Sequence, residues 1–140
     1  MRRFLLLALV AGAVAAFLAW PRLNTVETGL TPEYPDLQPR EYAASEQEVT
    51  RAVKAAIGHL PRFELVGAGA GRGGSEVQAV ATTRVLRFKD DVNARIRREG
   101  GKTRVSVRSK SRVGSIDFGQ NARNVRELLA ALDQEMSARR

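Results

Sequence analysis

Apolar residues recur at intervals of three and four positions in two separate parts of the chain, residues 49–60 and 125–136. This spacing places them along one face of a helix, as in an amphipathic helix that packs on a core. Each stretch follows a polar pair with the spacing of a capping box, in which side chains bond free amides of the first turn. The pairs are Ser45 with Glu48 and Asp117 with Gln120, with Asn121 as an alternative cap.

Between these helices the pattern changes to the alternation that is typical of β-strands. The clearest segment is residues 92–108, while 63–67 and 76–88 predict two more strands around a glycine-rich loop at 68–75. Two helices on one face of an antiparallel sheet bury that face and leave the other partly exposed. We therefore expect a single α+β domain at residues 45–140, with a four-stranded antiparallel sheet and two amphipathic helices on one face.

The segment at residues 92–108 has the pattern of a tight hairpin. Two consecutive glycines at 100–101 suit a primed turn, which needs positive φ. A two-residue loop also fixes the register of the pairing. Ile96 then faces Val105 on the buried side of the sheet, and Arg97 faces Arg104 on the other side.

The first 21 residues resemble a membrane-targeting segment. Arg2 and Arg3 precede an uncharged run, Phe4–Trp20, that is roughly 25 Å long as a helix, and Trp20 suits a membrane interface. An uncleaved transmembrane helix would keep the arginines in the cytoplasm and place the domain in the periplasm of a Gram-negative bacterium. The alternative is a cleaved signal peptide, because residues 13–15 (AVA) have the form of a cleavage site. Both interpretations export the domain.

A proline-rich segment, residues 22–44, follows the targeting segment. It contains Pro32, Pro35 and Pro39, and no apolar period continues through it. This composition predicts an extended linker between the transmembrane anchor and the domain. The alternative is that part of the segment lies against the domain.

The composition excludes several kinds of functional site. The 140 residues include no cysteine and one histidine, which excludes disulfides, thiol nucleophiles and thiolate or histidine-based metal sites. We expect no metal and no cofactor. The net charge is +8, and eleven Lys and Arg residues lie between positions 84 and 112, against three acidic residues. A patch this concentrated favours an anionic partner.

The predicted hairpin gathers part of this charge on one sheet face. Arg97 faces Arg104, with Arg95 on the same side, and opposed like charges cost sheet stability. This favours a basic face that binds an anion, an anionic lipid or a protein partner. The alternative is that Asp90, Asp91 or Glu76 of a neighbouring strand neutralises the face. Nucleic acid is not expected, because the domain is exported and the face lacks exposed aromatic residues for stacking.

A dense polar run between the hairpin and the last helix carries a family resemblance. RFKDDV at residues 87–92 and VRSKSRVGSIDFGQN at residues 107–121 resemble the motifs of the family called domain of unknown function 1499. The resemblance covers about Arg87–Leu132. It implies a small exported, membrane-tethered or organellar domain without an established activity. The family-like polar positions are Asp90, Asp91, Arg108, Ser109, Ser111, Arg112, Gly114, Asp117, Gly119 and Asn121.

These residues allow three interpretations. In the first, the carboxylates and arginines form a buried ion-pair network that locks the last helix to the sheet. In the second, they form an anion-binding pocket, in which Arg108 and Arg112 bind the anion and Ser109, Ser111 and Asn121 orient it. In the third, an uncharacterised enzyme uses Asp90, Asp91 and Asp117 near the two serines. The leading hypothesis is a non-catalytic, membrane-anchored envelope protein that binds an anionic lipid, a small anion or a protein partner.

Overall fold

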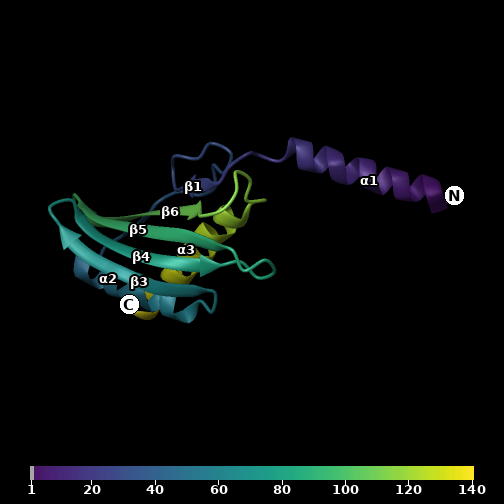
Figure 1. The fold of residues 1–140 in the computed structure, drawn as a ribbon. Helices are drawn as coiled ribbons and strands as arrows, with labels where there is room; N and C mark the ends of the chain where they lie inside the picture. Colours follow the sequence, from purple (N-terminus) through teal and green to yellow (C-terminus); the bar gives the residue numbers. More distant parts are fainter. Residues whose placement is uncertain (1) are drawn as a thin grey trace.

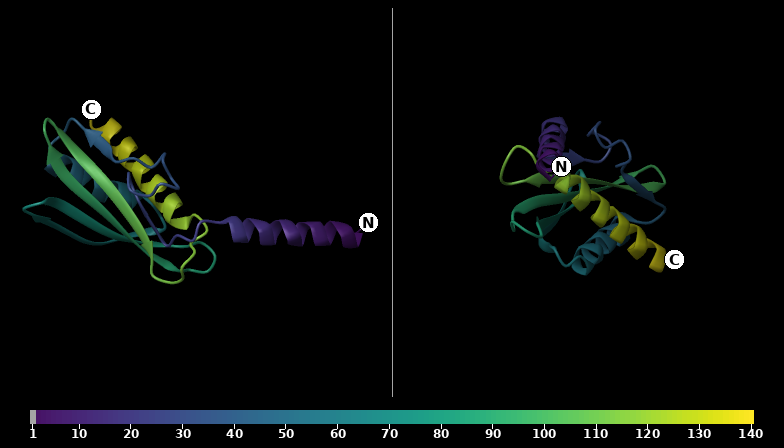
Figure 2. Two further views of the ribbon diagram at one scale, coloured as in Figure 1. Left: turned by 90° about the horizontal axis from the view of Figure 1, so that it is seen from above. Right: turned by 90° about the vertical axis from the view of Figure 1, so that its right-hand side faces the viewer.

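The computed structural model describes residues 2–140, with side chains from Phe4 onward, and shows a twisted sheet covered by helices on one face (Figures 1 and 2). Within these residues the chain forms three helices: α1 (Arg2–Ala19), α2 (Glu46–His59) and α3 (Gln120–Ala138). The strands are β1 (Thr25–Glu27), β2 (Arg40–Tyr42), β3 (Phe63–Gly71), β4 (Gly74–Thr82), β5 (Lys89–Glu99) and β6 (Lys102–Ser111).

The antiparallel sheet has six strands rather than the predicted four. Its order is β1-β6-β5-β4-β3, and β2 pairs with β6 on the same edge as β1. The two additional strands come from residues 22–44, which were predicted to be a linker. This segment is held to the domain because Val26, Leu37 and Tyr42 are buried in the core. The hydroxyl of Tyr42 also donates to Asp133 Oδ1 of α3 at 2.5 Å.

The predicted transmembrane helix is wrong. No helix among the described residues is long and apolar enough to cross a membrane. The physical reason is length: α1 ends at Ala19, so its apolar part, from Phe4, is roughly 24 Å long, short of a hydrocarbon core of about 30 Å. The side chains of Arg2 and Arg3, on which the predicted orientation depended, lie outside the described residues.

The hairpin prediction is confirmed. Ile96 pairs with Val105 and Arg97 pairs with Arg104 across β5 and β6. Ile96 and Val105 are fully buried under the helices. The capping box of α2 is confirmed as well, because Ser45 Oγ accepts from the Glu48 amide while the Glu48 carboxylate accepts from the Ser45 amide.

Several element boundaries differ from the prediction, and the hairpin is longer than predicted, with β5 beginning at Lys89 and β6 continuing to Ser111. β3 continues through the glycine-rich stretch to Gly71, and β4 ends at Thr82, so that residues 83–88 form a loop. The α3 cap differs too: Gly119, at φ +78°, precedes the first helical residue. Asp117 still stabilises the start of α3, because its carboxylate accepts from the backbone amides of Gly119 and Asn121.

The core lies between the sheet and the helices α2 and α3. Apolar side chains from one face of β4, β5 and β6 meet the apolar stripes of both helices. The largest fully buried side chains are Val26, Val49, Val53, Ile57, Val77, Val92, Ile96, Val105, Val107, Leu128, Leu129 and Leu132. The opposite face of the sheet carries no helix among the described residues.

Candidate functional site

The alternation of β5 and β6 divides the predicted polar cluster between the two faces of the sheet. Successive side chains of a strand point to opposite faces. Asp90, Ser109 and Ser111 are buried on the helix face, whereas Asp91 and Arg112 are exposed on the open face. The structure therefore does not bring the arginines and the serines together in one pocket.

On the helix face, Asn121 connects α3 to β6. Its Nδ2 donates to Ser111 Oγ at 2.8 Å and to the backbone carbonyl of Asn24 at 3.0 Å. Its Oδ1 accepts from Ser109 Oγ at 2.6 Å. Asn121 and Ser109 have no exposed surface, so these bonds form in a medium of low dielectric constant, where they are strong.

Asn124 continues this network toward Asp90. It is one helical turn beyond Asn121, on the same face of α3, and its Nδ2 donates to Ser109 Oγ at 3.1 Å and to Asp90 Oδ2 at 2.8 Å. The sequence analysis did not identify Asn124 as part of the cluster. Its spacing of three from Asn121 is the signal that points to it. We call Asp90, Ser109, Ser111, Asn121 and Asn124 the buried network.

Asp90 is the acidic member of the buried network. It is 2% exposed. Burial raises the pKa of its carboxyl above the ordinary value, although hydrogen bonds from Asn124 and Ser111 act in the opposite direction. The carboxyl therefore keeps its proton to a higher pH in the folded protein than in the unfolded chain.

We expect Asp90 to make the protein less stable as the pH rises. Between the ordinary pKa of 3.8 and the raised folded-state pKa, the native protein binds more protons than the unfolded chain, so the free energy of unfolding falls with pH. Asp90→Asn removes this titration and keeps an acceptor for Asn124. Urea unfolding of both proteins from about pH 4 to pH 7 measures the effect. Parallel stability curves would contradict it.

On the open face, the predicted arginines form ion pairs with carboxylates. Arg112 donates from both Nε and Nη2 to Asp91, with Nη2 at 2.7 Å from Oδ1, and this bonding raises the pKa of its guanidinium. Arg108 lies 3.8 Å from a carboxylate oxygen of Glu27 on β1. Exposed pairs of this kind contribute little to stability because water and salt screen them.

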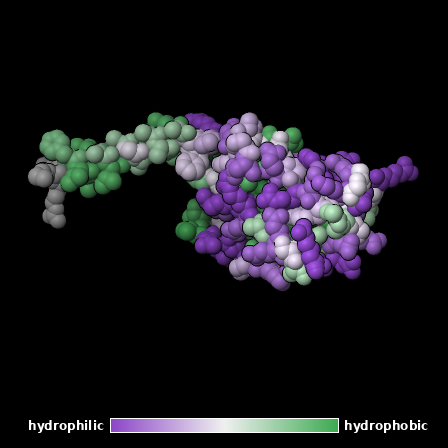
Figure 3. Space-filling model, turned by 180° about the vertical axis from the view of Figure 1, so that it is seen from behind, coloured by the Kyte–Doolittle hydropathy of each residue, from purple (hydrophilic) through white to green (hydrophobic). Residues whose placement is uncertain are grey.

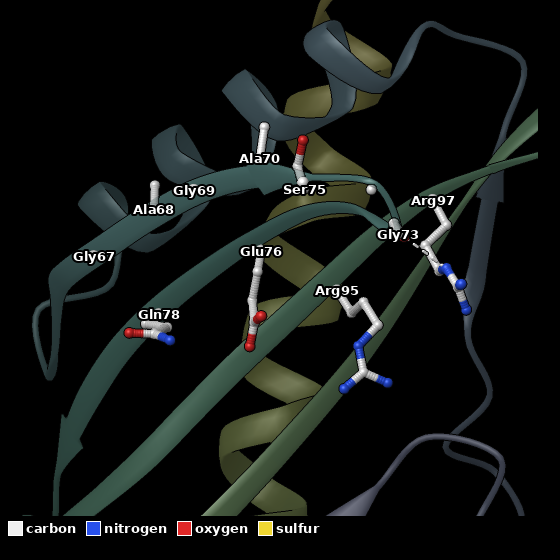
Figure 4. A pocket seen from close by; sticks show the side chains of 12 residues that line it. Gly67, Ala68, Gly69, Ala70, Gly73, Ser75, Glu76, Gln78, Arg95 and Arg97 are labelled. Atoms are coloured by element: carbon white, nitrogen blue, oxygen red, sulfur yellow. Dashed lines mark hydrogen bonds between the residues drawn. The ribbon is translucent and has the colours of Figure 1, made fainter.

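The open face also has a hollow of about 750 Å³ beside β3 (Figure 4). The side chains of Glu76, Gln78, Arg95 and Arg97 point into it, and Arg97 Nε donates to the Gly73 carbonyl at 2.7 Å. The floor is bare backbone, because the open-face positions of β3 beyond its irregularity at Leu65–Gly67 are glycines. These are Gly67, Gly69 and Gly71. Arg104 stands apart from this hollow and pairs with Glu41 of β2 at 3.5 Å.

A second cavity, of about 490 Å³, lies at the end of the domain from which α1 leaves. Two loops, residues 83–88 and 112–118, and the first turns of α3 surround it, and Asp90 and Ser111 of the buried network reach its floor. We call it the end cavity. Its other polar lining residues are Arg62, Thr83, Arg84, Asp117, Gln120, Arg123 and Glu127, and its apolar lining residues are Val85, Leu86, Phe88, Val113, Ile116 and Phe118.

The two loops have defined conformations. Thr83 closes the first loop, because its amide donates to the Phe88 carbonyl and its hydroxyl accepts from the Phe88 amide, both at 2.8 Å. Arg87 and Phe118 have φ values of +58° and +51°, which side-chain-bearing residues seldom adopt. Backbone strain of this kind tends to cluster at functional sites. The sequence analysis missed the first loop, because it predicted residues 76–88 as one strand, whereas the second loop falls in the polar run between the hairpin and the last helix.

Comparisons with known proteins find a family model and partial likenesses to solved structures. Two crystal structures resemble this chain in part: TTHA0849 from Thermus thermophilus, with 17% identity over 81% of this chain and 97% of that chain at a TM-score of 0.42, and CalU16 from Micromonospora echinospora, with 16% identity over 71% of this chain and 73% of that chain at a TM-score of 0.41. A search of curated proteins finds no match. The family model described as Protein of unknown function (DUF1499) matches residues 18–132. Because this match covers most of the chain, the protein belongs to the DUF1499 family.

Proposed function

We propose that the protein is a non-catalytic binding domain whose end cavity holds one anionic amphiphile, a lipid-like molecule with a negatively charged head and an apolar tail. The observation that carries the proposal is the division of the cavity lining. Gln120 and Arg123 of α3, with Arg62 paired to Glu127 of the same helix, line one side, and the exposed apolar side chains lie on the two loops, where Arg84 is the one arginine of the lining. Small-molecule sites combine an apolar wall with a few polar groups that fix orientation in this way.

The charges of the cavity favour an anion over a cation. Asp117 uses both carboxylate oxygens to bond the first turn of α3, and Glu127 pairs with Arg62 at 2.7 Å. The third acidic residue of the lining, Asp90, accepts from Asn124 at 2.8 Å, so all three carboxyl groups already have partners within the protein. Arg123 bonds a neutral partner, the Gln120 side chain, at 3.2 Å, and a guanidinium fork suits a carboxylate or a phosphate.

Arg62 adds a buried donor to this side of the cavity. Its Nη1 donates to the Thr82 carbonyl at 3.1 Å, while its Nε is buried and has no hydrogen-bond partner among the described residues. A buried donor without a partner costs free energy that an added acceptor recovers. Because this atom has almost no accessible surface, a ligand oxygen would accept from it only after the Arg62 side chain shifts toward the cavity.

The apolar side of the cavity suits an acyl chain. Val85, Leu86 and Val113 each leave more than half of their surface exposed on the loops. Covering apolar surface contributes about 25 cal/mol per Å². An acyl chain between the loops covers surface that the folded domain alone leaves in contact with water.

Replacing Arg123 by alanine is expected to weaken the binding of a fluorescent fatty acid at least about tenfold, the typical loss for a hydrogen bond to a charged group. The assay is a fluorescence titration of the full chain without vesicles. Arg126→Ala is the matched control, because Arg126 lies on the same helix, outside the cavity, and pairs with Asp36. Equal affinities for the two variants, or no binding by the wild type, would contradict the proposal.

A catalytic role for the same site is the second candidate, and Asp90 is the observation that favours it. A buried carboxyl with a raised pKa at the floor of a cavity suits a proton donor. Incubation with ester and phosphoester amphiphiles distinguishes the two functions. Turnover that disappears in Asp90→Asn would support catalysis, whereas tight binding without turnover supports the binding domain.

A further inference from the structure

We infer that the two loops around the end cavity dock on the surface of an anionic lipid bilayer, with the cavity mouth facing the lipid. We call residues 83–88 and 112–118 the docking loops. The inference rests on the proposed function, because a cavity for a lipid-like anion is best filled from the surface that supplies it. It adds the place where the ligand enters and the orientation of the domain.

The tips of the docking loops are apolar and exposed. Val85 is 86% exposed, Leu86 67% and Val113 58%, and all three belong to well-defined turns or loops at one end of the sheet. Scattered single apolar residues on a surface need no explanation, but a contiguous group at a cavity mouth marks an interaction site. Phe88 and Phe118 extend the group at 45% and 47% exposure.

Basic residues alternate with these apolar tips. Arg84, Arg87 and Lys89 lie in or beside the first loop, and all three are exposed. Their long side chains can reach the lipid phosphates while the neighbouring apolar groups enter the interface. An apolar tip flanked by cations complements an anionic bilayer, which offers phosphates above hydrocarbon. A dry protein interface usually has few charged residues at its centre.

The chain preceding the domain gathers apolar side chains at the same end. The ring of Phe118 lies 5.8 Å from that of Phe17 in α1 and 6.1 Å from that of Trp20, measured between centroids. The backbone amide of Asp117 donates to the Leu23 carbonyl at 3.1 Å, which fixes the second docking loop to this segment. Figure 3 shows apolar surface on α1 and at the adjoining end of the domain. The apolar side chains of the docking loops and of the segment that leads into the domain therefore lie at the same end of the domain.

Labelled cysteines test the inference directly, because the chain has no cysteine of its own. Leu86→Cys and Val113→Cys carry the environment-sensitive dye NBD in the full-length protein. The matched control is Val66→Cys on β3, which is 55% exposed and outside the docking loops. The probes are vesicles of phosphatidylcholine alone and of phosphatidylcholine with phosphatidylglycerol, and sedimentation measures how much protein is bound.

With the anionic vesicles, the labels at 86 and 113 are expected to shift to the blue, brighten several-fold and be quenched by nitroxide lipids. The label at 66 should remain as in water. Arg84→Gln together with Arg87→Asn is expected to weaken vesicle binding about fivefold for each charge removed, and added salt should weaken it further. Asparagine is chosen at 87 because it tolerates the positive φ of that position.

Labels at 86 and 113 that stay in a water-like environment on sedimented vesicles would overturn the inference, since the chain would then bind through another part. Absence of vesicle binding would overturn it as well. The titration with the soluble fatty acid contains no vesicles, so it succeeds or fails independently. Docking with no soluble binding refutes the cavity proposal alone, and soluble binding with no docking refutes this inference alone.

Discussion

Replacing Asn121 with leucine is expected to lower the free energy of unfolding by about 3 kcal/mol, because leucine fills a similar volume but makes none of its hydrogen bonds. The substitution leaves the hydroxyls of Ser109 and Ser111 without this partner in a buried site. Urea unfolding followed by circular dichroism measures the change. The loss should appear as a lower midpoint with an unchanged slope.

Gln134→Leu is the matched control, since Gln134 lies on the same helix with its side chain exposed. Its effect should stay within about 0.5 kcal/mol. A double-mutant cycle with Ser109→Ala then isolates the bond between Ser109 and Asn121. If Asn121→Leu were as mild as the control, the buried network would not hold α3 to the sheet, and its residues would be free to serve a ligand.

Replacing Gly74 with alanine is expected to cost about 3 kcal/mol or more, the second large effect in the molecule. Gly74 begins β4 at φ +112°, and an added Cβ would lie 2.2 Å from the Ile96 carbonyl oxygen. The obstacle is backbone of the neighbouring strand, which cannot turn aside as a side chain can. Chemical denaturation of the full chain measures the loss, and the hairpin of β3 and β4 should lose amide exchange protection with it.

Gly71→Ala is its control, because Gly71 pairs with Gly74 across the same turn and nothing lies within 4 Å of its added Cβ. The free energy of unfolding should change by no more than about 0.5 kcal/mol. The same substitution by alanine would then have very different effects on stability at two glycines that face each other in one turn. Equal losses would show that the steric contact at Ile96 relaxes.

The parts of the fold that depend on interactions between residues close in the sequence were predictable from the sequence. Gly100 and Gly101 admit few turn types, so the register of β5 and β6 followed from two residues and an alternating pattern. The α2 cap followed in the same way from Ser45 and Glu48. In each case neighbours in the sequence supply all the interactions that decide the structure.

The site was less predictable because it depends on how far β6 extends. With β6 continuing to Ser111, alternation sends Ser109 and Ser111 to the helices and Arg108 and Arg112 to the open face. The sequence shows these residues as one polar run. The same alternation that predicted the hairpin would have separated them, had it been carried three residues further, from Arg108 to Ser111.

The end cavity was not predictable from local patterns. Val85 and Leu86 belong to an apolar stretch that reads as strand, and their exposure follows from the turn that begins after Thr83. The strands β1 and β2 are three residues each, in a segment with three prolines, so pairing with β6 decides their structure rather than their own composition. Both features depend on contacts between distant parts of the chain.

The attachment of β1 and β2 to β6 has a consequence for the order in which the protein acquires its structure. The Thr28 hydroxyl accepts from the amide of Val107, a residue 79 positions later. β1 and β2 can therefore pair only after β6 has been synthesised. Pairing over such separations closes slowly, because the intervening chain must be ordered first. Until then the early segment has no sheet edge of its own. Its prolines have no backbone N–H to donate to a neighbouring strand, so they reduce its capacity to pair with a wrong strand before β6 is available.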